Sequence, residues 1–382
     1  MPILRGGVTA DNYYTPDIYI EEQELDIPEK PAGVSSKIMG IIGQFQRGSL
    51  HEVITVTGEK QFKEKLGGFL EKYPGSKAAF TAFKRGVKKL ILVNVRGAGA
   101  TEAAATLKTT DAKDWVKVIK TGPGLYSNDC LVEVVATNGA HKVLLSHPDI
   151  KIEVYDSIKS GEDLVKSINM LSKEYRAELV AEGVPAEVVN QAFEGGSDGS
   201  APIATHYKGS TDSSTGKKTG LELMKTSIEV TDVVTDIFVS DIMNQAMIKA
   251  AEDMNWYTYL PTAQGTNVAT AITTRNNYDS EFGHLSTGWA KSKDKGWFVP
   301  VAVYDCVAHL LSLVQDGTAG FTFKDVESLD VELSADDFES LSKAQVVCMG
   351  QMLDNERSLV YGLKSDLLAF LSKYAWIDKG SR

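Results

Sequence analysis

The sequence predicts a mixed α/β (α+β) fold that is divided into several domains. Two almost wholly apolar runs, residues 37–43 and 90–95, have the pattern of strands buried on both faces, and helical segments lie between them. A strand, a helix and a second strand at this spacing indicate a parallel crossover connection. The chain has 382 residues, which is more than one ordinary domain of about 100–200 residues needs.

The first thirty residues are predicted to form an extended arm. Within residues 15–22 the side chains alternate as they do in a strand. Ile18 and Ile20 lie on one face, whereas Tyr19 and Glu21 lie on the other. Prolines on both sides separate this strand from the rest of the chain. It therefore either pairs with a distant strand of its own chain or adds to the sheet edge of another subunit.

Between the two buried strands, the sequence predicts a short strand over 53–56 and two helices. The first helix covers 59–66 and ends at a pair of glycines. The second covers 77–85, and Ser76 is the predicted N-cap.

The next part of the chain is predicted to be rich in short strands, at 115–119, 131–136, 141–145 and 151–155. Apolar residues at 164, 168, 171, 175 and 179 then advance by four and three positions, which predicts one amphipathic helix over 162–182. A further helix is predicted over 186–193. The polar, glycine-rich segment 195–220 has the composition of exposed loops.

Regular structure is predicted again in the last 150 or so residues. Strands are expected at 233–239, 256–260 and 297–304, and helices at 241–254, from Ser334 onward, and at 358–374. Ser334 and Asp337 have the spacing of a capping box, which would place Phe338 and Leu341 on the inner face of their helix.

Composition and charge exclude several classes of function. Hydrophobic residues make up 43% of the chain, which is ordinary for a globular protein, and the net charge of −11 disfavours binding to nucleic acid. No apolar run has the roughly 20 residues that cross a bilayer, and the first eleven residues lack the core of a signal peptide. We therefore expect a cytoplasmic protein. Cys130, Cys306 and Cys348 lie in apolar stretches and are predicted to be buried, inert thiols.

One short motif suggests a serine hydrolase. Residues 195–199 (GGSDG) match G-x-S-x-G, the turn that presents a nucleophilic serine, here Ser197. That turn needs a strand before it and a helix directly after it, whereas the sequence predicts a helix before it and has a proline at 202. Asp241 and His284 follow in a permissive order, so catalysis by Ser197 stays a remote alternative.

No other pattern predicts a catalytic, metal or cofactor site. Residues 215–219 (TGKKT) resemble a phosphate-binding loop, but position 211 is threonine rather than glycine and position 218 is lysine rather than a hydroxyl residue. His141, His147 and Asp149 do not have the spacing of a common metal site. We therefore predict a protein that is not an enzyme and needs no cofactor.

Several longer motifs, taken in order, resemble those of one protein family. Residues 16–22 (PDIYIEE) are similar to its N-terminal strand P-G-V-Y-x-E-E, with Asp17 in place of glycine. The other matching segments are 33–48, 53–68, 80–96, 123–129 (PGLYSND) and 194–199 (EGGSDG). The family is that of the contractile tail sheath proteins of myophages, R-type pyocins and related injection systems, and the resemblance spans roughly residues 13–260.

The resemblance implies a mechanical function. Sheath subunits form rings or helical strands, expected as hexameric layers, around an inner tube, and their contraction drives the tube through a cell envelope. The arm would donate a strand to a neighbouring subunit through Ile18, Tyr19, Ile20, Glu21 and Glu22. Gly195, Gly196 and Gly199 would form a structural turn, because glycine adopts backbone angles closed to other residues.

The resemblance also predicts a domain organisation. Residues 1–30 would be the arm, residues 31–100 the core, completed by 295–382, and residues 101–294 an outer insertion with a flexible loop at 195–220. Family members usually continue into a tube-facing domain, so we expect this chain to be truncated, short or divergent at its end.

The expected partners are copies of the chain, the tail tube protein, and baseplate and tail terminator proteins. The expected location is a virion tail or injection particle that is assembled in the cytoplasm of a bacterial host. A non-polymerising adaptor or terminator related to the sheath is the alternative.

Overall fold

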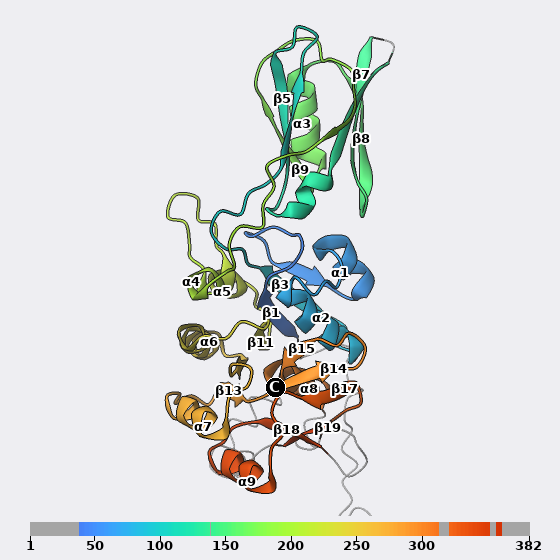
Figure 1. Cartoon of the computed structure of the whole chain (residues 1–382). Coiled ribbons are helices and arrows are strands. Elements are labelled where there is room, and N and C mark those ends of the chain that lie inside the picture. Colours follow the sequence, from blue (N-terminus) through green and yellow to red (C-terminus); the bar gives the residue numbers. More distant parts are fainter. Residues whose placement is uncertain (1–37, 138, 313–320, 352–356, 361–382) are drawn as a thin grey trace, which may run out of the picture. The chain divides into compact units, whose positions relative to one another are not determined.

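A six-stranded sheet organises the part of the chain that the computed structural model describes, residues 38–137, 139–312, 321–351 and 357–360 (Figure 1). Its strands, in spatial order, are β13 (Gly283–Ser286), β12 (Tyr257–Pro261), β11 (Asp232–Thr235), β1 (Met39–Gly43), β3 (Leu90–Asn94) and β2 (Ile54–Val56). All neighbouring pairs are parallel except β3 with β2, which is antiparallel. The predicted parallel crossover between 37–43 and 90–95 is therefore confirmed.

The central strands are apolar on both faces because the sheet separates two hydrophobic cores. Every residue of β1 is buried. Since side chains alternate along a strand, Met39 and Ile41 belong to one core and Ile42 belongs to the other. This explains why the sequence of β1 is a continuous apolar run without alternation.

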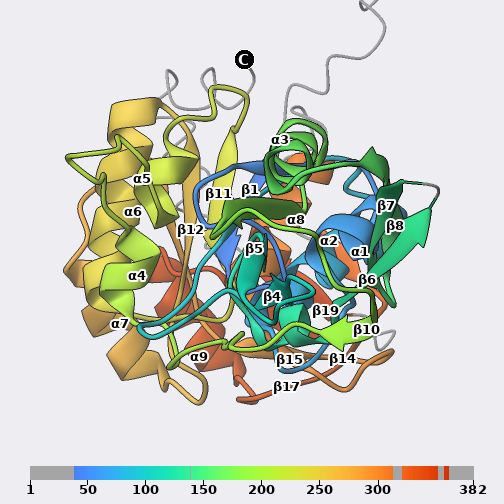
Figure 2. The same ribbon diagram turned by 90° about the horizontal axis from the view of Figure 1, so that it is seen from above.

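Helices cover both faces of the sheet (Figures 1 and 2). The core on the first face contains residues of α1 (Glu59–Leu66), α2 (Pro74–Lys84) and α8 (Val301–Leu311). The core on the second face contains residues of α4 (Ala204–Lys208), α5 (Gly220–Met224), α6 (Asp241–Met254), α7 (Val268–Asn276) and α9 (Ala335–Lys343). The result is a three-layer α/β/α arrangement.

A separate α/β unit is inserted between β3 and β11; we call residues 102–194 the insertion module. It contains an antiparallel sheet of β4 (Ala104–Lys108), β5 (Asp114–Lys120) and β9 (Tyr175–Leu179). A second antiparallel sheet contains β10 (Val188–Ala192), β6 (Leu131–Thr137), β7 (Ala140–His147) and β8 (Ile150–Ile158). Together with α3 (Gly161–Leu171), these sheets enclose a third hydrophobic core around Trp115. The 3-10 turn η2 (Leu125–Asp129) lies just before β6.

Two small antiparallel sheets complete the described chain. One consists of β15 (Phe298–Pro300), β14 (Trp289–Ser292) and β17 (Val326–Leu329). The other consists of β16 (Thr322–Phe323), β19 (Arg357–Val360) and β18 (Cys348–Gln351). A parallel bridge between Ser286 and Val347 connects the end of β13 to the residue before β18.

Of two helices predicted in the insertion module, one is too long and the other is wrong. The predicted helix over 162–182 ends at Leu171, because the Ser172 hydroxyl accepts hydrogen bonds from the backbone N–H groups of Glu174 and Tyr175 and turns the chain into β9. The segment predicted as a helix over 186–193 is strand β10. In both segments the sheet provides backbone partners that the local pattern did not reveal.

Three predictions near helix boundaries are also wrong. Residues 297–304 are not one strand, because β15 ends at Pro300 and α8 begins at Val301. Ser76 is not an N-cap, since α2 begins at Pro74 with Tyr73 as its N-cap. Residues 358–360 belong to strand β19 rather than to a helix, and the rest of the predicted helix, 361–374, lies outside the described residues.

Other predictions are confirmed. Helices occur at 59–66 and 241–254 as predicted. Ser334 and Asp337 form the predicted capping box, with Ser334 Oγ accepting from Asp337 N at 3.3 Å.

Two predicted segments contain elements of the fold described above. The chain returns to the central sheet at Asp232, so the segment predicted as an outer insertion, 101–294, includes three strands of this sheet. The predicted loop 195–220 contains helix α4.

Candidate functional site

The predicted site residues fall into two groups. The arm residues Ile18, Tyr19, Ile20, Glu21 and Glu22 lie outside the described residues. Gly195, Gly196 and Gly199 lie where the chain returns from the insertion module to the core. The candidate site that can be built from the structure is therefore this junction.

The chain crosses between core and module twice, and the two crossings are hydrogen-bonded to each other. Thr101 N donates to Ser197 O, and Ser197 N donates to Thr101 O, both at 3.0 Å. Ser200 N donates to Ala98 O at 2.9 Å. The crossings, residues 97–101 and 195–200, thus form a short antiparallel ribbon.

The glycines of the return crossing are needed for two different reasons. Gly195 and Gly199 have φ angles of +86° and +71°, a conformation that favours glycine. Gly196 is instead required by close approach, since a Cβ atom there would lie 2.3 Å from Ser127 Oγ and 2.7 Å from Gly124 O. The interpretation from the sequence, that all three glycines supply unusual backbone angles, fits Gly195 and Gly199 only.

Asp198, between these glycines, connects the module to the core. Its side chain accepts hydrogen bonds from Leu125 N of the module (3.1 Å), and from Lys72 Nζ (2.6 Å) and Tyr73 OH (3.1 Å) of the core. Arg96 Nη1 lies 3.4 Å from the same carboxylate. Burial favours a raised pKa for Asp198, but these donors outweigh burial and hold its pKa below the ordinary value. Asp198 is therefore ionised at neutral pH.

Two buried guanidinium groups lie beside this junction. Arg96 donates from Nη2 to Gln46 O at 2.7 Å, and Arg47 donates from Nη2 to Lys63 O. The Nε atoms of both arginines and Nη1 of Arg47 have no hydrogen-bond partner among the described residues, whereas Arg96 Nη1 faces the Asp198 carboxylate at 3.4 Å. Burial lowers the pKa of both groups. Of these two groups, Arg96 is the one that contacts the Asp198 carboxylate.

Among the described residues, no catalytic triad is assembled around Ser197. The segment before it is strand β10, as an elbow requires, but the next helix, α4, begins only at Ala204. Ser197 Oγ accepts a hydrogen bond from Gly199 N at 3.1 Å. Asp241 accepts a hydrogen bond from Tyr278 OH at 3.0 Å, and His284 lies 3.6 Å from Asp305. The predicted triad members are thus engaged in separate contacts.

The other short motifs have structural roles in the described chain. The Asp212 carboxylate accepts from Ser214 N and Thr215 N, which folds the TGKKT segment into an exposed turn. His147 Nδ1 accepts from Asp149 N at 3.1 Å, so His147 Nε2 carries the proton and donates to Tyr126 O at 3.2 Å. Both nitrogens of this imidazole are therefore used. The prediction that the three cysteines are buried is confirmed, and all are free thiols.

Sequence reasoning missed a buried polar cluster between α8 and the sheet. Asp232 and Asp305 are both fully buried. Asp232 accepts from His309 Nδ1 at 2.5 Å and Tyr259 OH at 2.8 Å, and Asp305 accepts from Ser286 Oγ at 3.0 Å. Burial would raise the pKa of Asp232, but its bonds to His309 and the neighbouring hydroxyls lower it. The only signal in the sequence was the i, i+4 spacing of Asp305 and His309.

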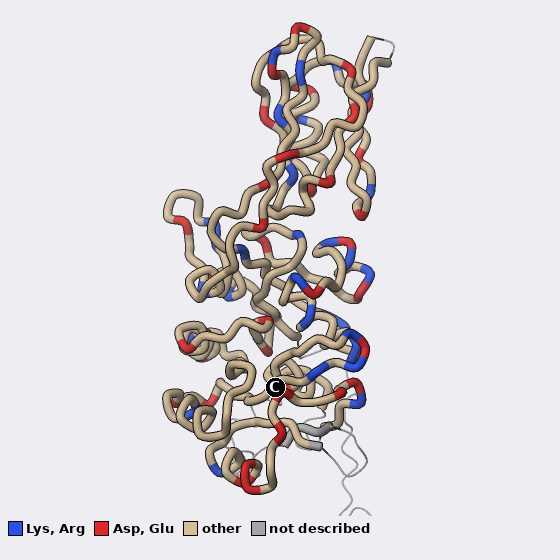
Figure 3. The backbone as a smooth tube through the Cα atoms, in the orientation of Figure 1, with Lys and Arg blue, Asp and Glu red and all other residues tan. Residues whose placement is uncertain are grey.

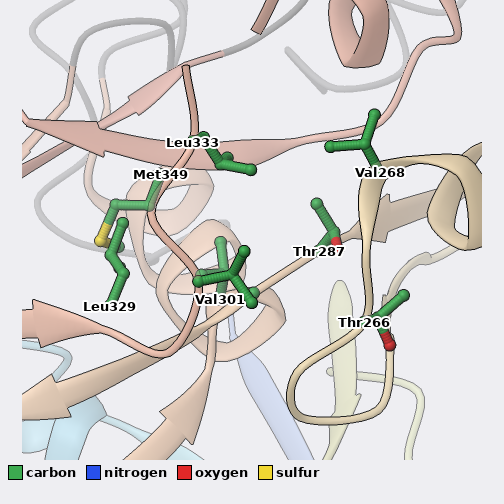
Figure 4. Close-up of a pocket in the computed structure, with 9 residues that line it drawn as sticks. Thr266, Val268, Thr287, Val301, Leu329, Leu333 and Met349 are labelled. Carbon is green, nitrogen blue, oxygen red and sulfur yellow. The ribbon is translucent and has the colours of Figure 1, made fainter. Parts of the chain in front are cut away.

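The described chain also contains a small apolar cavity of about 10 Å³ (Figure 4). It is lined by Val268, Thr287, Val301, Leu333 and Met349, among others. This volume is about that needed for one water molecule, so the cavity does not hold a substrate.

The distribution of charge gives no sign of a nucleic-acid interface in the part of the chain described. Acidic and basic residues are interspersed along core and module (Figure 3), which does not favour a nucleic-acid interface. Within the described residues, none of the helices has the length and apolarity needed to cross a membrane.

Comparison with known proteins identifies the fold. A scan against protein-family models finds no match, and a search of curated proteins finds none either. Among solved structures, a sheath tail protein from Listeria innocua aligns with a TM-score of 0.63 and 13% identity, covering 85% of this chain and 68% of that one. The chain has the fold of a sheath tail protein. This similarity confirms the predicted mixed α/β class and, at the level of the fold, the resemblance carried by the motifs.

Two further sheath structures are similar. A sheath tail protein from Desulfitobacterium hafniense has a TM-score of 0.59 and 13% identity, covering 91% of this chain and 76% of that one. The helical sheath of the anti-feeding prophage in its contracted state aligns more weakly, with a TM-score of 0.43 and 8% identity, over 91% of this chain and 67% of that one.

Proposed function

We propose that this chain is a structural, non-catalytic subunit of a contractile tail sheath. In this function, copies of the chain polymerise around an inner tube and contract to drive the tube through a cell envelope. The observation that carries the proposal is the fold shared with a sheath tail protein over 85% of the chain. Ser197, Asp241 and His284 each contact a different partner, which supports a role without catalysis.

Strand donation between subunits is the proposed mode of assembly. The alternating pattern at residues 15–22 supplies a strand, and strand addition gains main-chain hydrogen bonds that tolerate bending at flanking residues. Edge strands such as β2 and β16 each pair with one neighbour among the described strands, and edges of this kind can accept a donated strand. Contraction would then move rigid subunits while the segment 26–33 bends, and new intersubunit contacts would release the stored free energy.

The proposal includes further partners. Beside its own copies in hexameric layers, the subunit would contact the tail tube protein, and at its ends the baseplate and terminator proteins. The assembled particle would be a virion tail or an injection particle, built in the cytoplasm of the bacterial host.

Charged substitutions in the arm test the proposal. Ile18→Asp together with Ile20→Asp would place two carboxylates on the buried face of the donated strand, so we expect loss of assembly without loss of the core fold. Thr9→Asp, which adds a charge to the arm outside the strand, is the control and should assemble normally. Deletion of residues 1–25 should have the same effect as the double substitution. Negative-stain electron microscopy measures tube formation, and circular dichroism measures folding.

The possible outcomes separate the alternatives. Normal tubes from the double variant and the deletion would contradict strand donation. Discrete particles from the unaltered protein under all conditions would favour the adaptor or terminator alternative. Covalent labelling by a fluorophosphonate that disappears in Ser197→Ala would instead establish a serine hydrolase.

A further inference from the structure

The insertion module has its own hydrophobic core. The residues around Trp115 belong to a cluster that shares no member with the two cores of the central sheet. The module therefore does not depend on apolar contacts with the rest of the chain to bury its interior. Its position relative to the core must come from the two crossings and from the contacts beside them.

The two crossings are rich in glycine. They include Gly97, Gly99, Gly195, Gly196 and Gly199, and a Cβ atom at Gly99 or Gly195 would meet nothing within 4 Å. Glycine permits a wider range of backbone angles than other residues do. A two-segment ribbon of this composition can act as a hinge.

The contacts beside the crossings are polar, and Asp198 is their centre. One carboxylate oxygen accepts from Leu125 N, the first residue of η2 in the module. The other accepts from Lys72 Nζ and Tyr73 OH, just before α2 in the core. Arg96 Nη1 lies 3.4 Å from the same carboxylate, so a buried guanidinium group adds an ion pair to these hydrogen bonds. Contacts between charged donors and an ionised carboxylate are stronger than those between neutral groups, so loss of the Asp198 carboxylate should weaken docking.

We propose that Asp198 is a latch that holds the insertion module in one orientation on the core, with the glycine ribbon as the hinge. When the latch is released, both units keep their folds and the module changes orientation. Asp198 is a positioning residue in this device. The proposal does not depend on polymerisation and would hold for an isolated subunit.

Single-molecule energy transfer tests the latch in the full chain, because it is recorded at dilutions at which subunits do not associate. Dyes are attached to Lys166→Cys on α3 and Gln245→Cys on α6, both exposed positions, whereas the native cysteines are buried. We expect one narrow population in this parent protein. Asp198→Asn removes the charge and one acceptor, and the ratio of reoriented to docked molecules should rise about 10- to 100-fold.

Asp156→Asn is the matched control. Asp156 is an exposed residue of the module whose carboxylate lies 3.6 Å from Lys142. Its substitution should leave the distribution of energy-transfer efficiencies the same as in the parent protein. A single narrow population in Asp198→Asn, the same as in the parent, would overturn the latch. If Asp198→Asn does not fold by circular dichroism, Tyr73→Phe and Lys72→Met each remove one donor to Asp198. Both should then produce a smaller rise, and parent-like distributions in both would equally overturn the proposal.

Discussion

Asp236 should give the folded protein an unusual dependence on pH. It follows β11 and is fully buried. One carboxylate oxygen accepts from Gln44 N at 3.0 Å, the other from Phe238 N at 2.9 Å, and Tyr207 OH lies 2.9 Å from both. Burial outweighs these donors and raises the pKa of Asp236 to about 6.

The sign of the effect follows from the direction of this change. Because the pKa is higher in the folded protein than in the unfolded chain, the folded protein binds the proton more tightly. The resulting stabilisation is complete below the unfolded pKa and is lost as the pH rises through about 6. Between a pKa of about 6 and the ordinary value of 3.8, the difference is worth about 3 kcal/mol, since a tenfold change in proton affinity is worth about 1.4 kcal/mol.

Asp236→Asn removes this titration. The amide accepts through one oxygen only, so one backbone N–H loses its partner and the free energy of unfolding falls by about 1–3 kcal/mol at neutral pH. In urea unfolding between pH 4.5 and 7, the wild-type free energy minus that of the variant should decrease by about 2 kcal/mol as the pH rises. Asp253→Asn, an exposed position on α6, is the control for loss of one carboxylate. Parallel pH profiles for wild type and Asp236→Asn would refute the reasoning.

Two further substitutions test the packing and the junction. Phe62→Ala removes a ring that stacks on Phe69 at 4.6 Å between centroids and contacts Phe45 edge-on at 5.8 Å. The free energy of unfolding in urea should therefore fall by about 3–5 kcal/mol. A fall of less than about 1 kcal/mol would contradict this packing. Gly199→Ala adds a Cβ atom 2.6 Å from Ala98 O at a positive φ, whereas Gly195→Ala meets open space at a positive φ. Hydrogen exchange at Ser197 N and Thr101 N should therefore accelerate more in Gly199→Ala than in Gly195→Ala, and equal rates would refute the steric argument.

Sequence patterns correctly predicted those elements that are determined by residues close to one another in the chain. The capping box at Ser334 begins α9, and the pair of glycines ends α1. In both, the backbone groups at the helix end bond to residues only a few positions away. The buried strands β1 and β3 were predictable because each is a short, continuous apolar run, as is typical of a strand buried on both faces. These features need no knowledge of the rest of the chain.

Errors occurred where distant residues decide the structure. Strand β9 continues the apolar spacing of α3, but Tyr175 is buried because β9 pairs with β5. Residues 301–308 are all buried, so α8 has no polar face that would indicate a helical period. Asp198 could not have been found as a centre of contacts, because its partners Lys72 and Leu125 are 126 and 73 positions away in the sequence.

The carboxyl edge of the central sheet bears on the proposed function. In open α/β sheets, ligands commonly bind at this edge, where the strand order reverses, here between β1 and β11. Asp236 lies at that position, and its carboxylate oxygens accept hydrogen bonds from two backbone N–H groups and from Tyr207 OH. Beside it, Asn94 at the end of β3 accepts from Phe45 N and donates to Gly48 O.

The Asp236 and Asn94 side chains, which an enzyme could direct toward a substrate, thus hold backbone segments in place at this edge. Arg96, two residues past β3, leads directly into the first crossing to the insertion module and lies against Asp198. The edge that commonly binds ligands in open α/β sheets here anchors a second folded unit, which fits the proposed structural role.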